Sequence, residues 1–167
     1  ALGSAADITD VTKVPTDTVF VLDLSNNMWE DDQINTMIQA ANEALKTLLN
    51  ANPQNRVAVV GDSTQSSVLL PLEHYESSSS STFLTRDNNT LKATAVVGGE
   101  IKESFFERLT NTSHKYTQHG IYTGMQLLQS EEETTATVGG TTVTRAPVMV
   151  LMAEGAAKYG SGEIIEP

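Results

Sequence analysis

The segment Thr18-Val-Phe-Val-Leu-Asp-Leu-Ser-Asn-Asn27 contains the pattern that decides the fold. Its first part is a continuous run of β-branched, aromatic and aliphatic residues, which is typical of a strand covered on both faces of a sheet. Asp23 and Ser25 come at the carboxyl end of this run, at a spacing that lets a carboxylate and a hydroxyl bind one cation. The segment therefore predicts a central strand that delivers polar side chains to one edge of a sheet.

The rest of the chain alternates between helical and extended patterns. Apolar residues recur every three or four positions between Asp31 and Asn52, which predicts an amphipathic helix. The alternation of strands and helices predicts an α/β fold with a doubly wound, mostly parallel sheet flanked by helices. Further elements are expected as a buried strand at Arg56–Val60, an antiparallel edge strand at Gln65–Leu72, helices at Glu100–Leu109 and Gln118–Leu128, and a fourth core strand at Val148–Met152.

Two segments are expected to lie apart from this core. Gly139 and Gly140 separate two short threonine-rich runs, a pattern that favours a tight β-hairpin. We expect this hairpin to project as an arm over about residues 131–145. Residues 1–16 are small and polar, which indicates a leader or linker, and residues 17–167 are then one domain.

Composition excludes several classes of function. The formal net charge is −11 and the chain has no cysteine. An acidic protein of this kind is a poor match for nucleic acid phosphates or anionic membrane surfaces. Disulfides and zinc-thiolate sites are excluded, and no apolar run approaches the roughly 18 residues of a membrane span. Cations and neutral or basic partners remain.

Five motifs follow one another along the chain, with a helix that ends at Asn52-Pro53 after the first: Asp17–Ser25, Asn55–Gly61, Ser67–Leu72, Tyr116–Ile121 and Val148–Gly155. Together they resemble a von Willebrand factor A domain, in the form found in Gram-positive surface proteins and pilus-tip adhesins, and the resemblance extends from Asp17 to Tyr159. It implies a doubly wound sheet with a metal-ion-dependent adhesion site at its carboxyl edge. The C-terminal part of the usual domain would be absent here, which would leave one sheet edge uncovered.

The resemblance also implies a set of metal ligands. In that family, Mg²⁺ or Mn²⁺ is held by an Asp-x-Ser-x-Ser loop, a threonine on a second loop and an aspartate after the fourth strand. Asp23 and Ser25 match the first two positions, whereas Asn27 replaces the second serine and Glu154 replaces the last aspartate. Thr117 lies two residues beyond the position of the family's threonine. Ser25 and Asn27 are equally consistent with ordinary turn formation.

Lys115 is the departure that matters most for the metal. Alignment on Gly120 and Ile121 places it at the threonine's liganding position. An ammonium there would repel a divalent ion but would be attracted by Asp23 and Glu154, which predicts a salt bridge in place of the metal. A surface lysine is the alternative. The expected cofactor is therefore Mg²⁺ or Mn²⁺ if the site is functional, and none if Lys115 has taken the ion's place.

These features predict a cell-surface adhesion or protein-binding module with a degenerate metal site. Its partner would be a host or matrix protein or another pilus or surface subunit, and its location would be extracellular. One alternative is a structural module of a surface fibre that has no ligand of its own. The least favoured is a metal-dependent phosphatase-like enzyme with Asp23 as nucleophile, because no second acid lies two residues on and no Gly-rich phosphate loop is present. We therefore expect no enzymatic activity.

Overall fold

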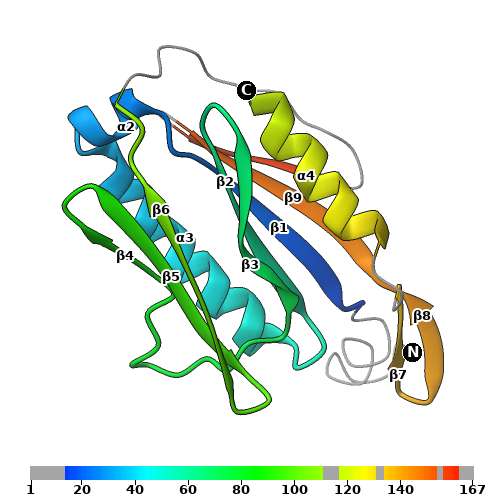
Figure 1. Ribbon diagram of the computed structural model, residues 1–167. Helices are drawn as coiled ribbons and strands as arrows, with labels where there is room; N and C mark the ends of the chain where they lie inside the picture. Colours follow the sequence, from blue (N-terminus) through cyan, green and yellow to red (C-terminus); the bar gives the residue numbers. More distant parts are fainter. Residues whose placement is uncertain (1–13, 111–116, 131–133, 154–155, 162–167) are drawn as a thin grey trace.

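The computed structural model describes residues 14–110, 117–130, 134–153 and 156–161. Its centre is a five-stranded sheet in which the three inner strands run parallel and the two outer strands run antiparallel to their neighbours (Figure 1). In spatial order the strands are β10 (Ala156–Ser161), β9 (Ala146–Ala153), β1 (Thr16–Asp23), β2 (Arg56–Asp62) and β3 (Ser66–Glu73). The prediction of a central first strand and an antiparallel edge strand is confirmed.

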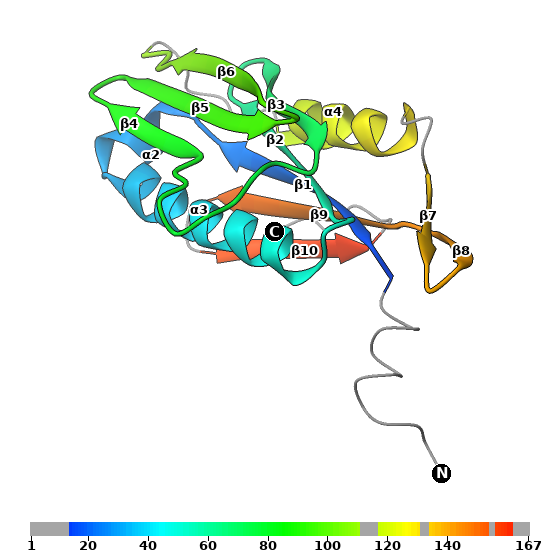
Figure 2. The same cartoon turned by 90° about the horizontal axis from the view of Figure 1, so that it is seen from below.

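Helices cover both faces of this sheet, as Figures 1 and 2 show. Phe20 and Leu22 of β1 are buried with the apolar stripe of α3 (Gln33–Ala51), whereas Val19 and Val21 are buried with Ile121 of α4 (Thr117–Ser130). Alternate side chains of a strand point to opposite faces, so a strand that is apolar throughout requires both covers. The structure confirms the α/β fold with helices on either side of the sheet.

A second, three-stranded antiparallel sheet packs against α3. Leu91, Ala93, Ala95 and Phe106 of this sheet belong to the same buried cluster as the apolar stripe of the helix. Asn42 of α3 donates to the carbonyl of Leu84 and accepts from its N–H, both at 2.9 Å, and so holds the edge of the sheet. The strands are β4 (Leu84–Asp87), β5 (Thr90–Val97) and β6 (Glu100–Glu107).

The prediction of a helix over Glu100–Leu109 is wrong, because this segment contains β6. Gly98 and Gly99 have φ angles of +57° and +77°, which reverse the chain in a tight turn and pair β6 with β5 along its whole length. Apolar residues at 101, 105, 106 and 109 mimic the spacing of a helix. The two glycines were therefore the better signal.

The predicted hairpin is confirmed as β7 (Thr135–Val138) and β8 (Thr141–Thr144). Gly139 and Gly140 form its turn with φ angles of +57° and +81°, a conformation that glycine adopts without strain. The hairpin extends from the main sheet beside the start of β1 (Figures 1 and 2). It is therefore an arm attached to the end of the sheet opposite Asp23.

The sheet extends one strand beyond β9, so that β10 and not β9 forms its outer edge in the described part of the chain. Strand β10 pairs antiparallel with β9 from Ala156 to Ser161. The segment Ala-Ala-Lys-Tyr-Gly-Ser contains no β-branched residue, so strand propensity gave little indication of it.

Candidate functional site

The carboxyl ends of β1 and β2 bring two acidic residues together. Asp23 and Asp62 are register partners at the last position of the parallel pair. The N–H of Leu24 donates to the carbonyl of Asp62 at 2.7 Å, which ties the loop after β1 to the end of β2. Parallel pairing of β1 with β2 therefore places Asp62 beside Asp23.

The loop after β1 is closed by its own polar side chains. The N–H of Ser25 donates to Asp23 Oδ1 at 3.0 Å, and Ser25 Oγ donates to Asn27 Oδ1 at 2.8 Å. Ser25 is only 2% exposed, whereas Asn27, in the short helix α2 (Asn26–Glu30), is exposed. A carboxylate, a hydroxyl and an amide oxygen thus gather at one edge of the sheet.

Trp29 is buried beneath the loop after β1 and holds it by a hydrogen bond. Its side chain is 1% exposed, and its Nε1 donates to the carbonyl of Leu24 at 3.0 Å. The guanidinium of Arg86 lies 5.2 Å from the centre of the indole ring, a cation–π arrangement. Trp29 therefore supports the loop and does not offer its ring to a ligand.

Asp62 is the most unusual group at this edge. It is 4% exposed, and its Oδ1 has no hydrogen-bond partner among the described residues. Burial, together with the nearby charge of Asp23, raises the pKa of Asp62 to about 7, although the N–H of Gly120 donates to the carboxyl group and opposes the shift. Near neutral pH this carboxyl group readily carries a proton.

The first turn of α4 is pressed against Asp62. A Cβ on Gly120 would lie 2.9 Å from Cβ and Cγ of Asp62 and 2.6 Å from Cγ1 of Val21, so only glycine fits there. Ser63, which follows Asp62, is 1% exposed, and its Oγ also has no partner among the described residues. Sequence reasoning missed Ser63 and the contact of Gly120 with Asp62.

The side chains of the remaining residues of the predicted metal site are not among those that the structure describes. Lys115 and Glu154 fall in segments outside the described residues, and Thr117 begins α4 but its side chain is also outside them. Within the described parts of the chain, no group of three or more His, Cys, Asp or Glu side chains could hold a metal ion. The replacement of a metal by Lys115 therefore stays a prediction.

The residues present fit part of a site for a hard cation. Asp23, Ser25 and Asn27 offer the oxygen donors that Mg²⁺ and Mn²⁺ prefer. The unpartnered Oδ1 of Asp62 adds an acceptor beside Asp23 that lacks a donor. A cation or a proton would compensate the charge of these two acids.

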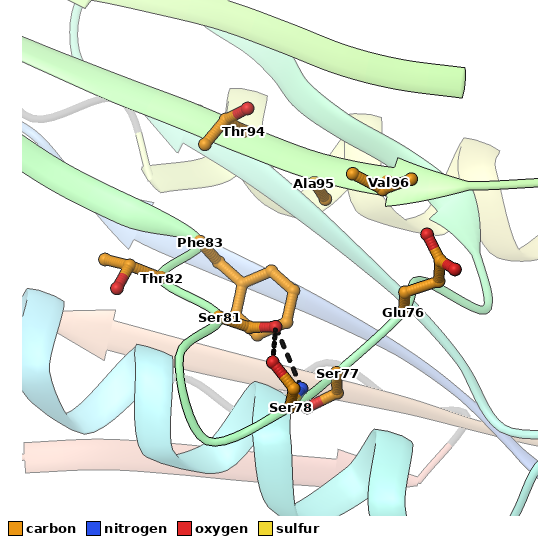
Figure 3. A pocket seen from close by; sticks show the side chains of 9 residues that line it. All are labelled: Glu76, Ser77, Ser78, Ser81, Thr82, Phe83, Thr94, Ala95 and Val96. Atoms are coloured by element: carbon orange, nitrogen blue, oxygen red, sulfur yellow. Dashed lines mark hydrogen bonds between the residues drawn. The ribbon is translucent and has the colours of Figure 1, made fainter. Parts of the chain in front are cut away.

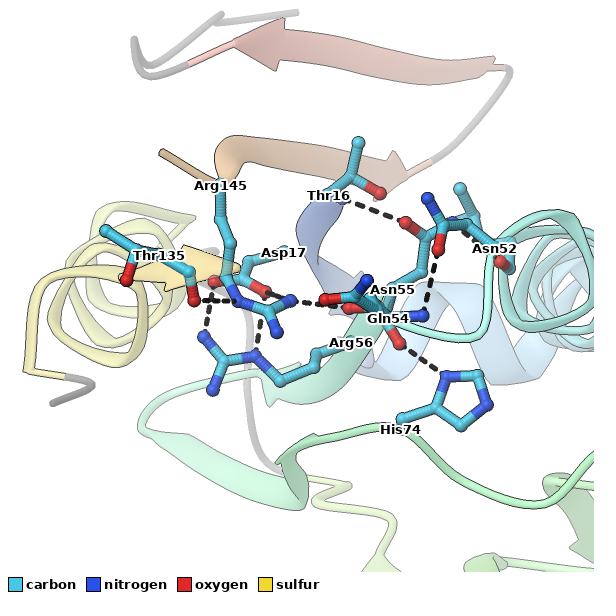
Figure 4. A network of polar contacts seen from close by, with 10 residues as sticks. Thr16, Asp17, Asn52, Gln54, Asn55, Arg56, His74, Thr135 and Arg145 are labelled. Carbon is cyan, nitrogen blue, oxygen red and sulfur yellow. Dashed lines mark hydrogen bonds and ion pairs between the residues drawn. The ribbon is translucent and has the colours of Figure 1, made fainter. Parts of the chain in front are cut away.

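The opposite end of β1 has a paired acid (Figure 4). Asp17 accepts from Arg56 Nε at 2.8 Å and Arg56 Nη2 at 2.6 Å, and Arg145 Nη1 lies 3.4 Å from Asp17 Oδ1. Arg145 also donates to the carbonyl of Thr135 at 3.3 Å, which attaches the hairpin arm to the sheet. This network is structural, because the carboxylate and both guanidinium groups all have hydrogen-bond partners within it.

His74 is likewise structural. Its Nδ1 lies 2.6 Å from the carbonyl oxygen of Asn55, at the same end of the sheet as Asp17 (Figure 4). This contact joins the segment after β3 to the turn before β2.

Comparison with known families gives one match. The family profile described as the von Willebrand factor type A domain matches residues 18–151. Searches among curated proteins and among solved structures gave no match. In the described part of the chain, no helix is both long enough and apolar enough to cross a membrane.

Proposed function

Because this chain belongs to the von Willebrand factor type A family, we propose that it is an adhesion-type protein-binding module whose contact site is the carboxyl edge of β1 and β2. The observation that supports this site is the convergence of Asp23, Ser25 and Asn27 beside the buried Asp62. Binding sites in doubly wound sheets lie at this edge. The partner would be a host or matrix protein, or another subunit of a surface assembly.

We further propose that the metal site is degenerate. Asn27 and Glu154 alter the ligand set of the family, and Lys115 supplies a fixed positive charge in place of the ion. If an ion does bind, Asp23, Ser25 and Asn27 would hold it, and it would supply an open position for a carboxylate of the partner. The proposed location is the surface of a Gram-positive cell, and we expect no catalytic turnover.

Calorimetric titration with Mg²⁺, Mn²⁺ and Ca²⁺ tests the degenerate site. We expect no saturable micromolar binding by the native chain. Saturable binding that Asp23→Ala abolishes and Asp31→Ala retains would contradict the degenerate site, because Asp31 is an exposed acid outside the loop.

Surface plasmon resonance with immobilised collagen, fibronectin and fibrinogen tests the protein-binding role. We expect binding to at least one of them that Asp23→Ala weakens and that EDTA leaves unchanged. If none of these proteins nor a candidate surface subunit binds, the adhesion proposal fails.

A second candidate function is a structural module of a surface fibre. The projecting β7–β8 arm favours it, because the outer strand β8 pairs only with β7 in the described sheets, and an unpaired edge is suited to joining another strand. Sedimentation velocity distinguishes the two functions. Assembly that is lost on Thr142→Pro and unaffected by Asp23→Ala would favour the fibre module.

A further inference from the structure

A groove opens beside β5 because its neighbour β4 is shorter. Strand β5 has eight residues and β4 has four. The N–H of Thr94 donates to the carbonyl of Phe83 at 2.8 Å, and beyond this point the carbonyl of Val96 accepts from the N–H of Glu76 at 2.7 Å. Residues 77–82 loop outward between these two contacts, and the space they leave has a volume of about 510 Å³.

The loop that borders the groove is held by its own serines. Ser78 N–H donates to Ser81 Oγ at 2.9 Å, and the hydroxyls of Ser78 and Ser81 lie 3.2 Å apart (Figure 3). Glu76 is anchored through its backbone, so its exposed side chain is free to meet a ligand without affecting the fold. The groove is therefore bordered by fixed segments of chain on both sides.

The lining combines an apolar floor, hydroxyl groups and one carboxylate. Phe83 and Ala95 are 1% and 6% exposed and form the floor. In Figure 3 the carboxylate of Glu76 lies at one end of the groove and Thr82 at the other, with the Phe83 ring between them. Thr94 and Ser81 add hydroxyl groups to the walls.

This chemistry selects among ligands by charge. Among the described residues, no Lys, Arg or His side chain lines the groove, so a phosphate or carboxylate would meet Glu76 without a compensating cation from them. Long basic side chains lay their aliphatic stem on apolar surface and keep the charged head at a polar site. Charge-assisted hydrogen bonds to a carboxylate are about twice as strong as neutral ones.

We propose that the groove bordered by Glu76, Phe83 and Val96 receives a lysine or arginine side chain of a partner protein. The stem lies over Phe83, Ala95 and Val96, and the ammonium or guanidinium donates to Glu76 and to the nearby hydroxyls. The proposal rests on the protein-binding function, but its residues belong to the β3–β4 loop and β5 and not to the Asp23 loop. The net charge of −11 favours a basic partner in the same way.

Titration of the ¹⁵N-labelled full chain, followed by NMR, tests this proposal. The probes are the blocked tripeptides Gly-Lys-Gly and Gly-Arg-Gly, with Gly-acetyllysine-Gly and Gly-Glu-Gly as matched controls. We expect the basic peptides to shift the amide signals of Glu76, Ser78, Thr94 and Val96, and Glu76→Gln to weaken this binding about tenfold. Glu43→Gln, an exposed acid on α3, should leave it unchanged.

Several results would overturn the proposal. Shifts spread evenly over acidic residues and insensitive to Glu76→Gln would show unspecific attraction to the net charge. No shift with either basic peptide, or shifts with maltotriose instead, would assign the groove to no ligand or to a neutral sugar. Asp23→Ala separates this site from the carboxyl edge, because it should weaken partner binding there while leaving the peptide shifts intact.

Discussion

The two ends of the β1–β2 pair each bury an aspartate, and the two aspartates have opposite surroundings. Asp17 and Asp62 are both 4% exposed. Asp17 is paired with Arg56 and Arg145, whereas Asp62 faces Asp23 and has one oxygen without a hydrogen-bond partner in the described part of the chain. A buried carboxylate beside groups of opposite charge supports the fold, whereas a buried carboxylate beside another acid is suited to take up a proton or a cation.

Asp17→Asn should produce the largest loss of stability. It removes the shared partner of two arginines whose side chains are 10% and 9% exposed, and breaking a buried ion pair from one side costs about 3–5 kcal/mol. Urea denaturation measures the free energy of unfolding, with the exposed Asp87→Asn as control. A loss below about 1 kcal/mol would mean that water replaces the carboxylate and that the two ends do not differ as described.

At neutral and alkaline pH, Asp62→Asn should raise the free energy of unfolding, whereas Asp17→Asn lowers it. The folded pKa of about 7 lies above the ordinary 3.8, so the contribution of Asp62 to stability is fully present below pH 3.8 and is lost as pH rises to about 7. Above that pH the amide should stabilise the fold by about 2–4 kcal/mol, since one pKa unit corresponds to about 1.4 kcal/mol. Urea denaturation of the native protein and of Asp62→Asn across this pH range isolates the contribution of this residue. If the difference between their free energies of unfolding did not change with pH, the raised pKa would be contradicted.

The sequence indicated the elements whose signals are local. The apolar run of β1, the helical period of α3 and the Gly139–Gly140 turn each lie within one short segment. The helix expected over Glu100–Leu109 failed because spacing was weighed above the glycine turn that precedes it. Strand β10 was missed because its residues have little strand propensity, and it forms a strand through its pairing with β9.

For the site, too, the sequence indicated the contacts between residues close in the chain and not those between distant residues. The Asp23 loop is local, and the neighbouring position of Asp62 followed from parallel pairing. The pairing of Asp17 involves residues 39 and 128 positions away, which no pattern in the sequence connects. The contact of Gly120 with Asp62 depends equally on how α4 lies on the sheet.

Gly120→Ala tests how tightly α4 closes the carboxyl end. Its Cβ would clash with Val21 and Asp62, which are buried and cannot move away, so the overpacking cost of about 1–3 kcal/mol should exceed the helix-propensity gain of about 1 kcal/mol. At Gly124 the nearest atom is the flexible end of Met149, at 2.9 Å, so Gly124→Ala should be close to neutral. Equal effects in urea denaturation would show that α4 does not press on Asp62.

Ser25→Ala should have the smallest effect on stability. It therefore shows most clearly whether this residue serves binding or the stability of the fold. Its hydroxyl donates to Asn27 Oδ1, an exposed acceptor that water can satisfy, so the loss should be about 0.5–1 kcal/mol. Binding at the contact site proposed for the carboxyl edge should nevertheless fall, because the loop loses the hydrogen bond that orients Asn27. If the cost instead approached that of Asp17→Asn, Ser25 would belong to the scaffold, and the carboxyl end of β1 would be as structural as its beginning.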